Sequence, residues 1–530
     1  MSWVLKIQLA FSLVTCELFV HQTVRARERP VVATKQGDLA GVSIISEGRR
    51  VNKYLGVPFA EAPVGNLRFK KPIPVKPWTG VRDSSKHALP CMQLPLQIDE
   101  KIFLDYGNNS EDCLYLNVWQ PASAVACEKN DSQSACGLRP IVVYIYGGGF
   151  LTGDASFFVF RGERFAALTD LIYITFNYRL GILGFFKTDL PEFSGNAGMF
   201  DQIEALKWIK QNAKAFGGDS DQITVWGQSA GAISISYHML SPLSEGLFKR
   251  AFLQSGVTAT GVPLQRLNNQ GAAHRVLGVF DCYNATVPWK NQAEESVKCL
   301  QKVDPNVLLK RSFKELPITT ISFLPTFGDE FLPNNPITEG LRIRTGQEFL
   351  VSTTPDEGSL FVVAILLRNP HLRILVSDDF RSPVRILMRL LLDVPSAKTN
   401  AIVDAYLKGM ASGHVNETEW KMNIAKLFGD SLFECAADSF GAIAAKQGHP
   451  VYRFLFDHKP SFSIWDNWFG VTHGDDIIFS LGTTPDLKSG FEMYGALPED
   501  ANIVLKEPED EEKEFSWDLV RVIGSFAKYG

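Results

Sequence analysis

Six residues in the middle of the chain decide the fold: Trp226-Gly227-Gln228-Ser229-Ala230-Gly231. A β-branched and aromatic run over 222–226 leads into them, and small and apolar residues that suit a helix follow over 230–240. A G-x-S-x-G sequence between a strand and a helix is typical of a nucleophile elbow, a sharp turn that exposes a serine hydroxyl. The flanking glycines have no Cβ, so the chain can turn tightly and the helix can lie close to the strand. The pattern predicts that Ser229 is a nucleophile.

The composition indicates a globular protein with a sizeable core. The chain has 530 residues, of which 45% are hydrophobic and 21% charged, and its formal net charge is -5. Because nucleic-acid binding needs a basic surface, DNA and RNA are excluded as partners. After the first residues, no apolar run approaches the roughly 18 residues of a membrane span, so no span is predicted.

The N-terminus has the pattern of a secretory signal peptide, which we place at residues 1–22. Lys6 precedes an apolar stretch over 7–14, Glu17 interrupts the pattern, and a charged stretch follows over 24–30. A buried N-terminal helix is the alternative, and the cleavage position stays open. We therefore expect a secreted or lumenal protein in which residues 29–530 form a single domain.

The cysteine pattern agrees with an oxidising compartment. Of the eight cysteines, seven lie beyond the signal peptide, and six of these form plausible local pairs: Cys91 with Cys113, Cys127 with Cys136, and Cys282 with Cys299. Cys435 is left over. None has the C-x-x-C spacing of a zinc site, so the pairs predict disulfides and no metal. Four predicted glycosylation sites also agree with secretion: Asn108, Asn130, Asn284 and Asn416.

Alternating strand and helix patterns predict an α/β fold. Buried strands are expected at 140–146 and 171–179, and a helix over 201–216 precedes the strand of the elbow. This order gives a large, mostly parallel sheet with helices on both faces. Further strands are expected at 30–34, 41–45, 349–353 and 451–456. The looser stretch 264–345 and the helical stretch 379–446 are interpreted as excursions from this one sheet, because no Pro- or Gly-rich linker separates them.

Three glycines, Gly147-Gly148-Gly149, follow the buried strand at 140–146. A flexible turn is the simple interpretation. The alternative is an oxyanion loop, since backbone N–H groups without side chains can approach a developing negative charge.

A serine hydroxyl needs a histidine to take its proton and an acid to orient that histidine. In folds with this elbow the order along the chain is serine, acid, histidine. His473 lies in a glycine-flanked loop after a strand, and His458, at the end of a strand, is the alternative. Glu357 follows the strand at 349–353, with Asp356 as its neighbour and competitor. The pattern leaves both choices open.

Seven motifs in this chain are similar to those of the type-B carboxylesterase and cholinesterase family of α/β-hydrolases: 111–117, 146–150, 177–181, 216–219, 226–231, 356–358 and 473–474. The resemblance implies an α/β-hydrolase fold with helical excursions that form a gorge, a serine carboxylic-ester hydrolase, and no metal or cofactor. It implies a triad of Ser229, Glu357 and His473, with the backbone amides of Gly148, Gly149 and Ala230 as the oxyanion hole. It also implies the disulfides Cys91–Cys113 and Cys282–Cys299 and the ion pairs Arg68–Glu111 and Arg179–Asp201.

Departures from the family pattern concern the substrate. Cholinesterases place a tryptophan in the first disulfide loop and an aromatic residue after the Glu-Gly-Ser of the acid loop, to hold a quaternary ammonium. Here the loop 91–113 has no tryptophan, and Leu360, beside Phe361, stands at the second position. Gln228 replaces a common glutamate, is similar to the elbow of juvenile hormone esterases and carries no charge. Smaller residues around Ile321 leave room for a larger acyl group. We expect a small-molecule substrate, a neutral or lipophilic ester.

Other functions stay open within and beyond this class. A cholinesterase or a juvenile hormone esterase is the alternative within it. An inactive, neuroligin-like adhesion protein and a slow carrier of lipophilic esters are the alternatives outside it. The chain stops at 526–530, inside a predicted last helix where family members continue, so a truncated C-terminus is expected. The natural ester, the oligomeric state, any anchor and the partner of Cys435 stay open.

Overall fold

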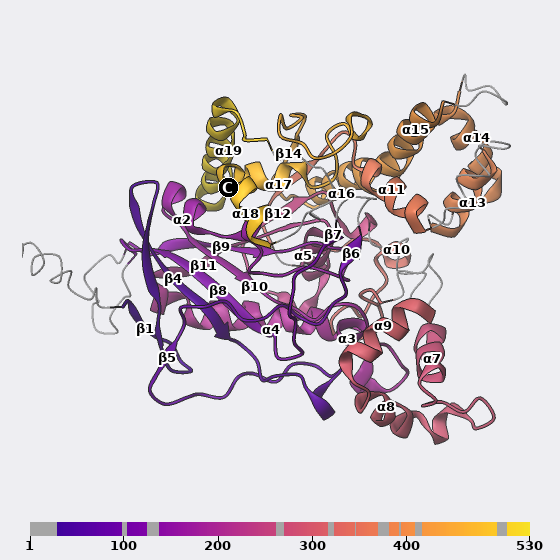
Figure 1. Cartoon of the computed structure of the whole chain (residues 1–530), viewed down its shortest axis with the longest axis horizontal. Coiled ribbons are helices and arrows are strands. Elements are labelled where there is room, and N and C mark those ends of the chain that lie inside the picture. Colours follow the sequence, from indigo (N-terminus) through magenta and orange to yellow (C-terminus); the bar gives the residue numbers. More distant parts are fainter. Residues whose placement is uncertain are drawn as a thin grey trace, which may run out of the picture.

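A computed structural model of the chain (Figure 1) describes residues 29–97, 103–124, 137–260, 270–315, 323–344, 346–368, 381–391, 394–408, 416–494 and 506–530. The predicted signal peptide, the pair Cys127 and Cys136, Asn130 and Ile321 lie outside the described residues.

The centre of the molecule is a nine-stranded sheet in the order β14-β13-β12-β11-β9-β10-β8-β4-β3. Its strands are β3 (Val42–Ser46), β4 (Arg49–Pro58), β8 (Tyr115–Pro121), β9 (Arg139–Ile145), β10 (Ile172–Phe176), β11 (Gly218–Gln228), β12 (Arg250–Gln254), β13 (Glu348–Thr353) and β14 (Val451–Leu455). The strands from β14 to β10 are parallel, and β8, β4 and β3 are antiparallel to their neighbours. Every residue of β10 and β12 is buried, as expected where helices cover both faces of parallel strands. The predicted large, mostly parallel sheet is confirmed.

Helices cover both faces of this sheet (Figure 1). The helices α2 (Glu163–Thr169) and α19 (Asp510–Tyr529) pack together on one face, and α4 (Ala197–Asn212) lies on the other. On that second face, α5 (Ala230–Leu240) contacts β11 and β12, and Gln202 of α4 donates to Ser234 of α5. Further helices are α3 (Gly181–Phe185), α10 (Pro336–Glu339), α16 (Cys435–Lys446), α17 (Asp475–Ser480) and α18 (Leu487–Tyr494).

Two expectations about these elements need correction. The helix predicted over 201–216 begins at Ala197, and its last turn is a separate 3-10 helix, Ala213–Phe216. Most of its side chains are buried on all sides, because the sheet covers one side and contacts such as Phe200 with Phe331 cover the other. The strand β1 (Val31–Ala33) does not join the main sheet. It turns back onto β2 (Asp38–Ala40) in a small sheet that β5 (Val81–Asp83) completes.

The predicted excursions form two outer helical groups, which Figure 1 shows at the right of the sheet. The first consists of α7 (Gln270–Val279), α8 (Ala293–Gln301) and α9 (Pro305–Glu315). The second consists of α11 (Gly358–Arg368), which precedes the predicted stretch 379–446, and of α13 (Ser382–Leu391), α14 (Ser396–Tyr406) and α15 (Glu417–Gly429), and it encloses a hydrophobic core of its own. The end of the predicted stretch, α16, is not part of an excursion, because it packs on β13 and β14. A hairpin of β6 (Leu96–Gln97) and β7 (Phe103–Leu104) completes the described elements.

The disulfides Cys91–Cys113 and Cys282–Cys299 are both formed. Cys435 is exposed at the start of α16 and has no disulfide partner among the described cysteines. None of the described helices has both the length and the apolar character that crossing a membrane requires.

Candidate active site

Ser229 lies in a strained turn between β11 and α5. Its φ is 55° and its ψ is -124°, a conformation that non-glycine residues adopt at a cost of about 1–3 kcal/mol. A Cβ on Gly227 would lie 2.6 Å from the carbonyl carbon of Gly231, and a Cβ on Gly231 would lie 2.0 Å from the oxygen of Ile145. Both elbow glycines are therefore required by the close approach of α5 to the sheet. The Ser229 amide donates to the Gln254 oxygen at 2.8 Å, which fixes the turn to β12.

Glu357 and His473 meet at the same end of the sheet, although 116 residues separate them. Glu357 follows β13 and is only 1% exposed, and its Oε2 lies 2.5 Å from His473 Nδ1. Its other oxygen accepts a hydrogen bond from the Thr354 amide at 2.9 Å. Because Nδ1 faces a carboxylate, it carries the proton of the neutral ring, and Nε2 is the basic nitrogen.

The two competing residues have other contacts. Asp356 Oδ2 accepts from the Val471 amide at 2.9 Å, so this carboxylate joins the acid loop to the segment that precedes His473. His458 Nε2 lies 2.9 Å from Glu512 of α19, and His458 does not line the cavity next to Ser229. The structure therefore brings Glu357, and neither competitor, to His473.

Two aromatic rings flank the His473 imidazole. The centroid of Phe361 lies 5.2 Å from it and that of Phe433 lies 4.9 Å from it. Phe361 comes from α11, and the buried Phe433 comes from a π-helical segment, Asp430–Glu434, that continues α15. Such segments are frequent at functional sites. Phe433 was not predicted, because no pattern of residues in the sequence marks the π-helical turn.

A cavity of about 430 Å³ opens beside Ser229 and His473. This volume fits a ligand of small-molecule size. Three of the four predicted pocket residues line it: Gln228, Leu360 and Phe361. Most of the other lining side chains are apolar or aromatic: Leu151, Phe157, Val159, Phe160, Ala364, Phe462, Ile464, Trp465, Ile477, Ile478, Leu487 and Phe491.

Two of the three predicted oxyanion donors line this cavity. Gly148 and Gly149 line it, with φ values of 101° and 63°. A Cβ on Gly148 would lie 2.1 Å from the Thr152 oxygen, so only glycine fits there. Ala230 is the first residue of α5, where a backbone N–H has no partner within the helix. The candidate donors thus come from two elements, the glycine loop after β9 and the start of α5.

Comparisons with known proteins give the family of the chain. The chain matches the carboxylesterase family over residues 28–530. The chain belongs to the carboxylesterase family. It is 32% identical to an acetylcholinesterase of Leptinotarsa decemlineata over 475 residues, which cover 85% of this chain and 74% of that protein. It is 31% identical to a cholinesterase of Mus musculus over 513 residues, which cover 94% of this chain and 79% of that protein. It is 33% identical to an acetylcholinesterase of Bungarus fasciatus over 472 residues, which cover 85% of this chain and 73% of that protein.

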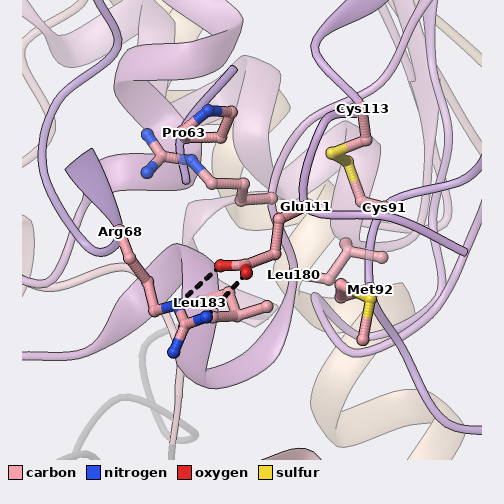
Figure 2. Close-up of a pocket in the computed structure, with 9 residues that line it drawn as sticks. Pro63, Arg68, Cys91, Met92, Glu111, Cys113, Leu180 and Leu183 are labelled. Carbon is pink, nitrogen blue, oxygen red and sulfur yellow. Dashed lines mark hydrogen bonds and ion pairs between the residues drawn. A yellow bond between two sulfur atoms is a disulfide. The ribbon is translucent and has the colours of Figure 1, made fainter. Parts of the chain in front are cut away.

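This carboxylesterase has the α/β-hydrolase fold, as the resemblance implies, and is a serine carboxylic-ester hydrolase that acts on small esters. Both ion pairs that the resemblance implies are present. Arg68 binds Glu111 through Nε and Nη2, each at 2.6 Å (Figure 2), and Arg179 binds Asp201 at 2.8 and 2.7 Å. Figure 2 shows the first pair near the disulfide Cys91–Cys113, around a cavity of about 10 Å³. A space of that size holds about one water, so this second cavity is structural.

Two aspartates, Asp475 and Asp476, follow His473 in this carboxylesterase. Burial raises the pKa of Asp475 to about 7, although its Oδ2 accepts from the Thr472 amide at 2.9 Å. Burial, and next to it the charge of Glu357, raises the pKa of Asp476 to about 7. Asp476 Oδ2 accepts from the Gln254 side chain at 2.9 Å, while its Oδ1 is buried without a hydrogen-bond partner. A negative charge on Asp476 is therefore unfavourable in the folded protein.

Gln228, predicted as a pocket residue, also contacts the catalytic-base candidate. Its side-chain Nε2 lies 3.1 Å from His473 Nε2. Within the described residues, no hydrogen bond joins Ser229 Oγ to His473. The structure thus places a neutral amide at the nitrogen that a serine nucleophile would use.

Three of the predicted glycosylation sites are described, and all three are exposed: Asn108, Asn284 and Asn416. Asn284 accepts from the Thr286 amide, and Asn416 caps α15 by accepting from the amides of Thr418 and Glu419. Their modification stays a prediction.

Proposed function

We propose that this chain is a secreted serine carboxylesterase that cleaves neutral or lipophilic esters through an acyl-enzyme on Ser229. The observation that carries the proposal is the arrangement at one end of the sheet: Ser229 on a strained elbow, and His473 held by Glu357 beside the same cavity. Gly148, Gly149 and Ala230 supply the candidate oxyanion hole.

In the proposed first step, Ser229 Oγ forms a bond to the ester carbonyl carbon while its proton moves to His473 Nε2. Glu357 supports the imidazolium through Nδ1, and the backbone N–H groups of the oxyanion hole stabilise the negative oxygen. Collapse of this intermediate breaks the ester C–O bond, and the leaving alcohol takes the proton from Nε2. Water then repeats the sequence on the acyl-enzyme, releasing the acid and restoring Ser229.

The cavity supports a neutral or lipophilic substrate. Among the described residues that line it, Asp475 is the one carboxylic acid, and Thr472 already occupies one of its oxygens. Gln228 brings no negative charge next to the nucleophile, and Leu360 offers no aromatic face for a cation. A long apolar chain would instead contact rings such as Phe160, Phe462 and Phe491.

A cholinesterase is the second candidate, and the relatives named above favour it. Trp465 lines the cavity and could bind a cation through its ring. The two candidates differ in their preferred substrate. The first predicts a higher kcat/KM for long-chain neutral esters and for a juvenile-hormone analogue than for acetylthiocholine, and the second predicts the reverse.

The test is hydrolysis of nitrophenyl esters of increasing acyl length by the purified chain and by two variants. Ser229→Ala should abolish turnover, while Ser396→Ala, which changes an exposed serine at the start of α14, should leave it intact. Turnover by Ser229→Ala at the native rate would contradict the proposal. An inactive, neuroligin-like protein would show no turnover in any form, and a slow carrier would bind esters with little steady-state hydrolysis.

Secretion has a separate test. The two formed disulfides and the exposed Asn108, Asn284 and Asn416 support it. Expressed in a eukaryotic cell, the chain should reach the medium and lose mass on treatment with an N-glycosidase. Retention in the cytosol without glycans would contradict this part of the proposal.

A further inference from the structure

Gln228 is adjacent to Ser229 in sequence, and its side chain contacts the His473 nitrogen that a serine nucleophile would need. Gln228 is the last residue of β11 and is 4% exposed. Its amide can stay there because Gly147 beside it has no Cβ; a Cβ at Gly147 would lie 2.7 Å from the Gln228 side-chain oxygen.

The hydrogen bond between Gln228 and His473 has one direction. Glu357 fixes the proton of the neutral ring on Nδ1, so Nε2 has a lone pair and no hydrogen. The Gln228 N–H group therefore donates to Nε2 across 3.1 Å. A Ser229 hydroxyl that transfers its proton must donate to the same lone pair, which accepts one strong hydrogen bond. The two donors exclude one another.

We propose that Gln228 is a positioning residue that caps the His473 Nε2 lone pair in the unliganded enzyme and releases it to Ser229 when an ester fills the cavity. The inference rests on the proposed function of Ser229 and His473. Gln228 and Ser229 both line the cavity, so an ester bound at Ser229 would lie beside the Gln228 side chain. Release of the cap therefore couples activation of the nucleophile to occupancy of the cavity.

An amide suits this role because it can hydrogen-bond to both the neutral and the protonated form of His473. A half-turn of the Gln228 side-chain amide presents its oxygen, which accepts from the imidazolium that forms after proton transfer. A carboxylate at this position could accept from the imidazolium but could never donate to the neutral ring. Gln228 thus offers a partner to both forms of the base without adding charge.

The charges around His473 show why an added carboxylate would matter. Glu357 faces the ring after β13, Asp476 of α17 interacts with the charge of the ring, and Asp475 lines the same cavity. The other neighbours, Phe361 of α11 and Phe433 of the π-helical segment, carry no charge, and neither do the glycines at 147–149. The site already has three acidic groups, and Gln228 avoids a fourth.

Two isosteric variants test the proposal. In Gln228→Glu, the added negative charge favours the imidazolium, so the acid limb of the kcat/KM profile should move to higher pH by about one to three units. In Gln228→Met, the competing donor is lost, so Ser229 should react with a fluorophosphonate about 2- to 10-fold faster at pH 8, the factor expected for one hydrogen bond. The same changes at the exposed Gln211 of α4 serve as matched controls and should move neither quantity.

The outcomes separate this inference from the proposed function. If Gln228→Met reacts no faster than the native chain and Gln228→Glu keeps the native acid limb, while both variants melt as the native chain does, Gln228 has no capping role. If the fluorophosphonate fails to label Ser229 in the native chain, the proposed function itself fails. A purely structural role for Gln228 would lower all rates together without moving the acid limb, which would also overturn the inference.

Discussion

Replacing Glu357 by glutamine should disable the enzyme through the histidine tautomer. Each carboxylate oxygen of Glu357 accepts one hydrogen bond, from His473 Nδ1 at 2.5 Å and from the Thr354 amide at 2.9 Å. A glutamine has one oxygen and one NH₂ group, so it can accept from only one of these two donors. If its oxygen stays with Thr354, its NH₂ group faces Nδ1 and forces the proton onto Nε2, where it blocks proton transfer from Ser229. The loss of the negative charge also removes support for the imidazolium.

For Glu357→Gln we expect kcat/KM to fall on the order of 10⁴-fold, the size of effect that a wrong histidine tautomer produces in serine hydrolases. The assay is steady-state hydrolysis of a nitrophenyl ester, with a thermal melt to verify folding. Asp356→Asn is the matched control, because an asparagine oxygen can still accept from the Val471 amide, and kcat/KM should change less than about 10-fold. A large loss for Asp356→Asn together with a small loss for Glu357→Gln would refute the assignment of the acid.

Two further predictions concern groups around His473. Phe433→Ala removes a ring that is 3% exposed and packs on the imidazole, so the free energy of unfolding should fall by about 3–5 kcal/mol and kcat should fall with it. Phe433→Leu should lose less of both, as measured by denaturant melts and ester hydrolysis. An unchanged kcat in a stably folded Phe433→Ala would contradict this prediction. The raised pKa of Asp476, about 7, means that the folded state holds a proton that the unfolded state releases, so this residue lowers stability progressively as the pH rises from about 4 to about 7. Asp476→Asn should therefore be more stable than the native chain by up to about 4 kcal/mol at pH 8 and nearly equal to it at pH 4, and melts in which the difference does not grow with pH would refute this.

The central sheet could be predicted from the sequence because its strands carry a local signal. The runs at 140–146 and 171–179 are apolar throughout, as fully buried parallel strands require, and the structure places β9 and β10 there. The elbow was predictable for a similar reason, since Gly227 and Gly231 are needed wherever a helix starts this close to a strand. By contrast, β1 left the main sheet because its hairpin partner β2 pairs with β5, a contact that no local pattern encodes.

The site was predicted only as far as the order of residue types along the chain allows. That order indicated Ser229, an acid near 356–357 and a late histidine, but the choice between Glu357 and Asp356 depends on which carboxylate faces the imidazole. In the structure Glu357 contacts the imidazole, while the Asp356 carboxylate accepts from the Val471 amide.

The contact between Gln228 and His473 joins residues 245 apart, and no sequence pattern around either residue indicates the other. Phe433 reaches the imidazole through a π-helical turn, and Gly358 packs so tightly on α15 that a Cβ would lie 1.9 Å from the Ala425 oxygen. Contacts of this kind depend on how distant elements pack, so a pattern within one segment does not predict them.

The central claim is that one activated serine at the elbow performs the chemistry, and mass spectrometry after fluorophosphonate treatment tests it most directly. We expect one covalent adduct per chain, located on Ser229, with a loss of ester hydrolysis that follows the extent of labelling. An adduct on another residue, or full hydrolytic activity in a chain whose Ser229 is labelled, would contradict it.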